Sequence, residues 1–148
     1  MENRLKVAIA ATRKAGRKTL DWFGDADLTV TQKGDQSPVT AADIAAEEIL
    51  KRELLTAFPE DSFLGEETGS HRGTSEFEWV VGPIDGTKSF IHGVPLFATL
   101  VACRKNGEGI VGVIYIPALN EIAYAAIGKG AWYKKDGHQL IPARVSTQ

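Results

Sequence analysis

Apolar side chains recur three or four residues apart along residues 3–23, a spacing that predicts an amphipathic helix with one buried face. A second stripe of the same period covers residues 40–58 and predicts another helix, which ends before Pro59. Thr40 is a good N-cap residue for this helix, and Asp43 follows it at nearly the spacing of a capping box. The basic residues of the first helix are expected to face solvent; they are Arg4, Arg13, Lys14, Arg17 and Lys18.

The pattern changes from residue 62 onwards to short runs rich in β-branched and aromatic residues, separated by turn signals such as Asn106-Gly107 and Asp136-Gly137. This spacing predicts an antiparallel meander, and two N-terminal helices packed on one of its faces give an α+β fold in layers. One further short strand is predicted between the helices, at Leu28–Thr31. The other expected strands are 62–67, 77–82, 96–104, 109–117, 121–128, 131–135 and 138–142.

Composition adds a few limits. With 148 residues, 43% of them hydrophobic and 24% charged, the chain is expected to form one globular domain. A formal net charge of −2 gives no electrostatic basis for binding nucleic acid or an anionic membrane. Cys103 stands alone in an apolar run, which predicts a core residue and a reducing compartment. Neither a signal peptide nor an apolar window of about 18 residues is present, so a cytoplasmic location is expected.

The last residues of the sequence bear on whether the predicted sheet is fully covered. The chain stops at Gln148, soon after a hairpin-like segment and without a closing helix or strand. A sheet that ends there is expected to leave an edge or a face uncovered. The expectation is therefore that a C-terminal half is missing, or that a partner supplies the cover.

Oxygen-rich residues gather in three segments, 37–43, 65–69 and 83–87. Mg²⁺ prefers oxygen ligands, and phosphatases with two metal ions need carboxylates that hold the ions about 3.5–4 Å apart. Acids at strand ends and turns can converge on one point, as these segments are predicted to do. Lys33 and Lys88 are either phosphate-facing cations or ordinary solvated lysines.

Each candidate acid also has a plain structural explanation. Glu66 follows a predicted strand and is either a metal ligand or a surface acid. Asp85 sits in an Asp-Gly turn, but Gly86 and Thr87 lead into a run that can begin a helix. Backbone amides at such a helix start bind anions, and the Thr87 hydroxyl can orient a water. Capping would explain Asp43 without catalysis, so both roles stay open.

Taken together, the segments GEETG, WVVGPIDGTKSF and SPVTAAD resemble the signature of the inositol monophosphatase superfamily, Gly-Glu-Glu followed by Asp-Pro-Ile-Asp-Gly-Thr. The resemblance extends over the whole chain, and GTKSFIHGVPLFATLVA is more similar to the histidinol-phosphatase type than to the inositol type. It implies a homodimer and Mg²⁺-dependent hydrolysis of a small phosphate monoester. Histidinol phosphate is favoured, inositol phosphate comes next, and a nucleotide or other sugar phosphate stays open.

The resemblance also implies a set of metal ligands. Glu66 and the Ile84 carbonyl would ligate the first metal, and Asp85 would ligate the second. Gly82 occupies the place of the family aspartate that binds both metals, and glycine has no ligand to offer. Two bare Mg²⁺ ions about 4 Å apart repel by on the order of 16 kcal/mol at an effective dielectric of about 20, a repulsion that bridging carboxylates offset. Gly82 is therefore expected to weaken metal binding.

The remaining roles concern water and phosphate. By resemblance, Thr87 and Asp43 would position and activate the attacking water with help from Glu66, and the amides of Gly86 and Thr87 would hold the phosphate. Residues 1–148 then correspond to the N-terminal portion of a Mg²⁺-dependent phosphatase domain whose C-terminal half is absent. The predicted function is phosphatase activity that is impaired in this chain. The alternative is a non-catalytic phosphate-binding or assembly module of the same fold.

Overall fold

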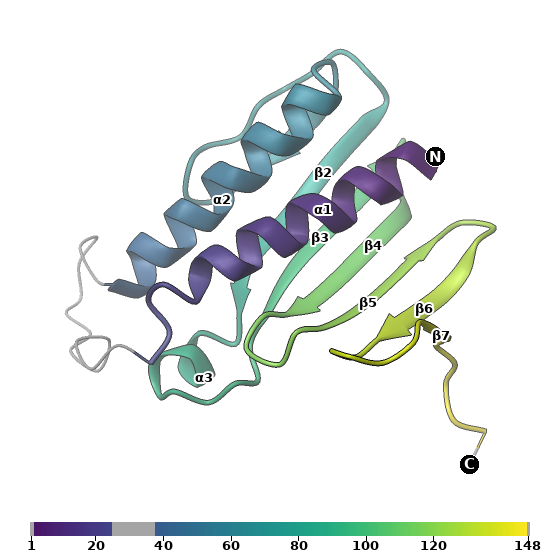
Figure 1. Ribbon diagram of the computed structural model, residues 1–148. Helices are drawn as coiled ribbons and strands as arrows, with labels where there is room; N and C mark the ends of the chain where they lie inside the picture. The colour runs from purple at the N-terminus through teal and green to yellow at the C-terminus, as the bar shows by residue number, and fades with distance from the viewer. Residues whose placement is uncertain (1, 25–37, 148) are drawn as a thin grey trace.

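The computed structural model describes residues 2–24 and 38–147, a range that excludes the predicted strand Leu28–Thr31 and Lys33. Within it, the long helices α1 (Glu2–Thr19) and α2 (Pro38–Ala57) lie side by side across one face of a seven-stranded sheet (Figure 1). A short helix, α3 (Thr87–Ile91), follows the second strand. The strands are β1 (Ser62–Leu64), β2 (Phe77–Asp85), β3 (Ala98–Lys105), β4 (Glu108–Ile116), β5 (Glu121–Ala126), β6 (Gly130–Lys134) and β7 (Ile141–Pro142).

The strand order follows the chain from β1 to β7, and every pair from β2 onwards is antiparallel. The predicted meander and α+β layers are confirmed. The first pair differs from the prediction, because β1 runs parallel to β2. A parallel pair needs a long return connection, which residues 65–76 provide. Part of that connection pairs with β1 through reciprocal backbone hydrogen bonds between His71 and Phe63, both 2.8 Å.

The helix boundaries depart from the periodic pattern. α1 ends at Thr19, because the following residues turn away and the Phe23 ring packs 5.0 Å from the Phe97 ring. α2 begins at Pro38, whose fixed φ suits the first turn of a helix. Thr40 therefore lies inside the first turn and the predicted N-cap at Thr40 is wrong. Among the described residues, no helix combines the length and the apolar content needed to cross a membrane.

Small residues let α1 approach the sheet closely. The buried side of α1 consists mostly of alanine, threonine and glycine, as the apolar period predicts. A Cβ atom added to Gly16 would lie only 2.5 Å from the Tyr115 ring, so this position accepts no larger residue without movement. Cys103 is buried beneath the helices, and this burial raises the pKa of its thiol to about 11. This agrees with the predicted core role of Cys103.

A buried ion pair joins the start of α1 to the start of β1. The Arg4 guanidinium donates to both carboxylate oxygens of Asp61, with Nε–Oδ2 3.2 Å and Nη2–Oδ1 3.0 Å, and its carbon lies 3.5 Å from the Phe77 ring centroid. Asp61 also accepts hydrogen bonds from Ser75 Oγ (2.7 Å) and Trp79 Nε1 (3.0 Å). The prediction that Arg4 faces solvent is wrong, because this carboxylate draws the side chain inward.

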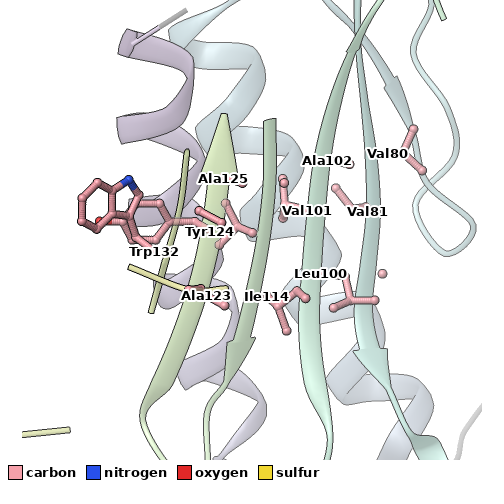
Figure 2. A pocket seen from close by; sticks show the side chains of 15 residues that line it. Val80, Val81, Leu100, Val101, Ala102, Ile114, Ala123, Tyr124, Ala125 and Trp132 are labelled. Carbon is pink, nitrogen blue, oxygen red and sulfur yellow. The ribbon is translucent and has the colours of Figure 1, made fainter. Parts of the chain in front are cut away.

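The sheet face opposite α1 and α2 carries an apolar groove of about 640 Å³ (Figure 2). Among its lining residues are Leu100, Ile114 and Trp132, and Ile114 is 49% exposed. Both long helices lie on the other side of the sheet (Figure 1). An uncovered face, expected from the sequence, is thus present in the described part of the chain.

Candidate active site

The three oxygen-rich segments converge because of the parallel pairing of β1 with β2. Parallel strands end on the same side of a sheet, so the loop that carries Glu66 and the end of β2 at Asp85 lie at one end of the molecule. Asp43, in the first turns of α2, reaches the same place, where its carboxylate forms a hydrogen bond with the Ile84 backbone. The structure therefore brings one acid from each predicted segment to a single end of the sheet.

Among these acids, Asp43 has a strongly raised pKa. Burial raises the pKa of Asp43 from 3.8 to about 7, and the nearby carboxylates of Glu67, Glu47 and Glu66 add to the increase, opposed by the hydrogen bond with Ile84. A carboxyl group whose pKa lies near neutrality can accept or donate a proton at physiological pH. Because α2 begins before Thr40, the capping-box explanation of Asp43 no longer applies.

A bulge at the end of β2 decides which way its last side chains project. Gly82 pairs with Leu100 and Asp85 pairs with Ala98, so three steps along β2 match two along β3. Residues directly opposite one another in an antiparallel pair project from the same face, and positions 98 and 100 share a face. Gly82 and Asp85 therefore project together, although their odd spacing would separate them in a regular strand.

The backbone at Gly82 does not require glycine. A Cβ atom added there would meet only Leu100 atoms, at 3.7 Å or more, and the φ angle is not in the left-handed region. This Cβ atom would point toward Leu100, which lines the groove on the uncovered face. Position 82 can thus accommodate an aspartate, and nothing in the local backbone requires glycine there.

The segment after Asp85 begins a helix, as its sequence predicts. Gly86 has φ +88°, a left-handed conformation that favours glycine, and an added Cβ would lie 3.1 Å from the Leu96 carbonyl oxygen. Thr87 opens α3 and is exposed, as are Asp85 and Lys88. The candidate phosphate-binding positions thus lie at the surface.

Comparison with known proteins decides the family. The sequence profile of the inositol monophosphatase family matches residues 1–148. This chain belongs to the inositol monophosphatase family. It is 44% identical over 128 residues to a histidinol-phosphatase of Chlorobaculum parvum, covering 86% of this chain and 49% of that protein. It is 42% identical over 143 residues to an inositol-1-monophosphatase of Mesorhizobium japonicum, covering 95% and 53%.

The fold comparison agrees with this family. The structure of extragenic suppressor protein suhB from Bartonella henselae superposes with a TM-score of 0.81 at 34% identity. That match covers 97% of this chain and 54% of the suhB chain. The chain of 148 residues spans about half the length of the curated relatives it matches. The family resemblance carried by its three acidic segments is confirmed.

The family implies a Mg²⁺ ion, and the side chains at this end of the sheet offer carboxylate oxygens as donors. Carboxylates are the ligands that Mg²⁺ prefers, and three of them, Glu47, Glu66 and Glu67, act on the pKa of Asp43. However, no three aspartate, glutamate, histidine or cysteine side chains in residues 2–24 and 38–147 lie close enough together to hold a metal ion. Mg²⁺ is usually held by one or two carboxylates and keeps several waters, so the described acids could hold the ion only with water and backbone oxygens completing its shell, and Gly82 adds no carboxylate.

Sequence reasoning missed one acid of this family member, Glu47. Its side chain is fully buried at the end of the molecule where Asp43 and Glu66 lie. A signal was available, because Glu47 follows Asp43 by four residues and therefore lies on the same side of α2. It also follows Ala46, which belongs to the buried stripe of the helix.

Asp43→Asn is expected to stabilise the protein at pH 8, without divalent cations, by about 1–2 kcal/mol after allowance for solvent screening, and to change stability little near pH 4. The folded pKa of about 7 lies above the model-compound value of 3.8, so the folded state loses stability as pH rises through this window. Urea unfolding followed by tryptophan fluorescence at several pH values measures the effect. Glu48→Gln, an exposed change on the same helix, is the control. Equal stabilisation at pH 4 and pH 8 would contradict the assignment.

Proposed function

We propose that this chain carries the N-terminal part of the site of a Mg²⁺-dependent phosphatase that acts on a small phosphate monoester. Histidinol phosphate is the preferred substrate in this proposal and inositol phosphate comes next. The observation that carries it is the convergence of Asp43, Glu66 and Asp85 at one end of the sheet in a member of this family. The match to a histidinol-phosphatase at 44% identity supports the substrate order.

The proposal assigns oxygen donors to the metal. They are the Glu66 carboxylate, the Ile84 carbonyl and the Asp85 carboxylate, and the bulge in β2 gives Asp85 the same face as position 82. When bound, Mg²⁺ supplies Lewis-acid polarisation of the phosphoryl group and lowers the pKa of bound water. Because Gly82 offers no carboxylate, we propose that the chain holds the ion weakly and turns over slowly.

The residues of the chain have their own part in hydrolysis. Asp43 and the Thr87 hydroxyl hold the attacking water, with Glu66 assisting, and Asp43 accepts its proton, as a pKa near 7 allows. The water oxygen bonds to phosphorus, the ester P–O bond breaks, and the leaving oxygen takes up a proton. The amides of Gly86 and Thr87 hold the phosphate oxygens at the start of α3. A cytoplasmic location and a homodimer complete the proposal.

The second candidate function is a non-catalytic phosphate-binding or assembly module of the same fold. Gly82 favours it, since the position accommodates a side chain and has none. The apolar groove on the uncovered face also favours it, since a face of this kind is suited to a partner. The two candidates differ in whether turnover can be restored.

The test is phosphate release by the chain as it stands and by a fusion to the second half of the Chlorobaculum parvum histidinol-phosphatase. With Mg²⁺, the proposal expects slow release by the chain and clear release by the fusion carrying Gly82→Asp. Release should be faster from histidinol phosphate than from inositol 1-phosphate, and EDTA or Asp85→Asn should abolish it. No release by the Gly82→Asp fusion, despite a folded protein that binds phosphate, would favour the module.

A further inference from the structure

The buried carboxylate of Glu47 is hydrogen-bonded to the loop that carries Glu66. Its Oε1 accepts from the Glu66 amide at 3.1 Å. Its Oε2 accepts from the Glu67 amide (2.9 Å), the Thr68 amide (2.5 Å) and the Thr68 hydroxyl (2.7 Å). Three consecutive backbone amides therefore converge on one side chain of α2.

Two further residues, Gly65 and Lys51, help to hold the loop against α2. A Cβ atom on Gly65 would lie 2.7 Å from Glu47 Oε2, so glycine is what allows the loop to approach the carboxylate. Lys51, one turn further along α2, donates to the carbonyls of Thr68 (3.3 Å) and Gly69 (3.1 Å). α2 thus offers an acceptor to the amides of the loop and a donor to its carbonyls.

The burial of Glu47 calls for compensation. A buried carboxylate is costly unless it is paired or hydrogen-bonded, and bonds from amides to a carboxylate are stronger than neutral ones. Among the ion pairs of residues 2–24 and 38–147, none includes Glu47. The loop amides therefore provide the compensation, and the loop conformation and the carboxylate stabilise each other.

We propose that Glu47 is a positioning residue that orders residues 65–68 and so fixes the backbone from which Glu66 projects. The Glu66 side chain is exposed, so the apolar core does not hold it and its direction depends on this backbone. The effect on metal affinity rests on the proposed role of Glu66 as a Mg²⁺ ligand. The ordering of the loop does not rest on that role.

Glu47→Gln tests the proposal, because the carboxamide replaces one acceptor oxygen by an NH₂ group that faces the loop amides. Hydrogen exchange at the amides of Glu66, Glu67 and Thr68 is expected to become at least tenfold faster. The Mg²⁺ dissociation constant, followed by amide chemical shifts, is expected to rise about ten- to a hundredfold, the range for residues that orient a ligand. Glu48→Gln should change neither quantity.

The two readouts separate the possible failures. Unchanged exchange in Glu47→Gln overturns the ordering of the loop, and faster exchange with unchanged Mg²⁺ affinity overturns the positioning of Glu66. If Mg²⁺ shifts no loop resonance in the parent or in Gly82→Asp, the proposed function fails, while exchange still decides the role of Glu47. If Glu47→Gln does not fold, Gly65→Ala forces the loop away from the carboxylate and must accelerate exchange at the same amides.

Discussion

Asp61→Ala is expected to lower the free energy of unfolding by about 3–5 kcal/mol, the range measured when one partner of a buried ion pair is removed. The substitution leaves the Arg4 guanidinium without its carboxylate and deprives Trp79 Nε1 and Ser75 Oγ of their acceptor. Because small domains have only about 5–15 kcal/mol of stability, part of the population should be unfolded at 37 °C. Urea denaturation followed by circular dichroism measures the loss.

A more exposed ion pair, between Lys14 of α1 and Glu53 of α2, provides the control for Asp61. Lys14 and Glu53 also approach closely, at 2.5 Å, but their side chains are 56% and 35% exposed, against 17% and 2% for Arg4 and Asp61, so Glu53→Ala should cost far less. Arg4→Ala combined with Asp61→Ala should cost less than the sum of the single changes, since each removes the same interaction. A loss for Asp61→Ala no larger than that for Glu53→Ala would contradict the importance of this pair.

Gly82→Asp is expected to tighten Mg²⁺ binding at least tenfold, which corresponds to about 1.4 kcal/mol. The backbone accepts the new side chain, whose nearest neighbours are Leu100 atoms at 3.7 Å or more. The bulge in β2 makes it project from the same face as Asp85, so the two carboxylates can serve one cation. Amide chemical shifts recorded during a Mg²⁺ titration give the dissociation constant.

Gly82→Asn is the matched control, because it fills nearly the same volume without the charge. It should bind Mg²⁺ much more weakly than Gly82→Asp. In EDTA, Gly82→Asp should be less stable than the parent, since it places a second carboxylate on the face of Asp85 and against the apolar Leu100, and Mg²⁺ should raise its melting temperature more. Equal affinities for the aspartate and asparagine variants would show that position 82 does not contribute a metal ligand.

Much of the secondary structure was predictable because it depends on neighbours in the chain. The apolar period of residues 3–23 located α1, and Asn106-Gly107 located a hairpin whose turn has φ +50° and +84°. The boundaries were less predictable, since they depend on what packs against each end. Phe23 continues the apolar period of α1, yet it leaves the helix to contact Phe97.

The candidate site was predictable as a set of segments but not as an arrangement. The acids could be named from their positions after strands and before a helix. However, Gly82 and Asp85 share a face only because β2 has a bulge between them, and this bulge is seen only in the pairing of β2 with β3. The contacts of Arg4 with Asp61 and of Glu47 with the loop at Glu66 join residues far apart in the sequence. No local pattern predicts such pairs.

By itself, the sequence determined the family, the two helices, the succession of strands and the absence of a ligand at position 82. Each of these depends on residue identity or on short-range periodicity, which the chain carries in any conformation. Only the tertiary structure decided that β1 runs parallel to β2, so that Glu66 and Asp85 lie at the same end of the sheet. It also decided that Asp43 is half-buried near other acids, which raises its pKa to about 7. Burial and charge proximity arise from packing between distant segments, and for that reason they appear only in the folded chain.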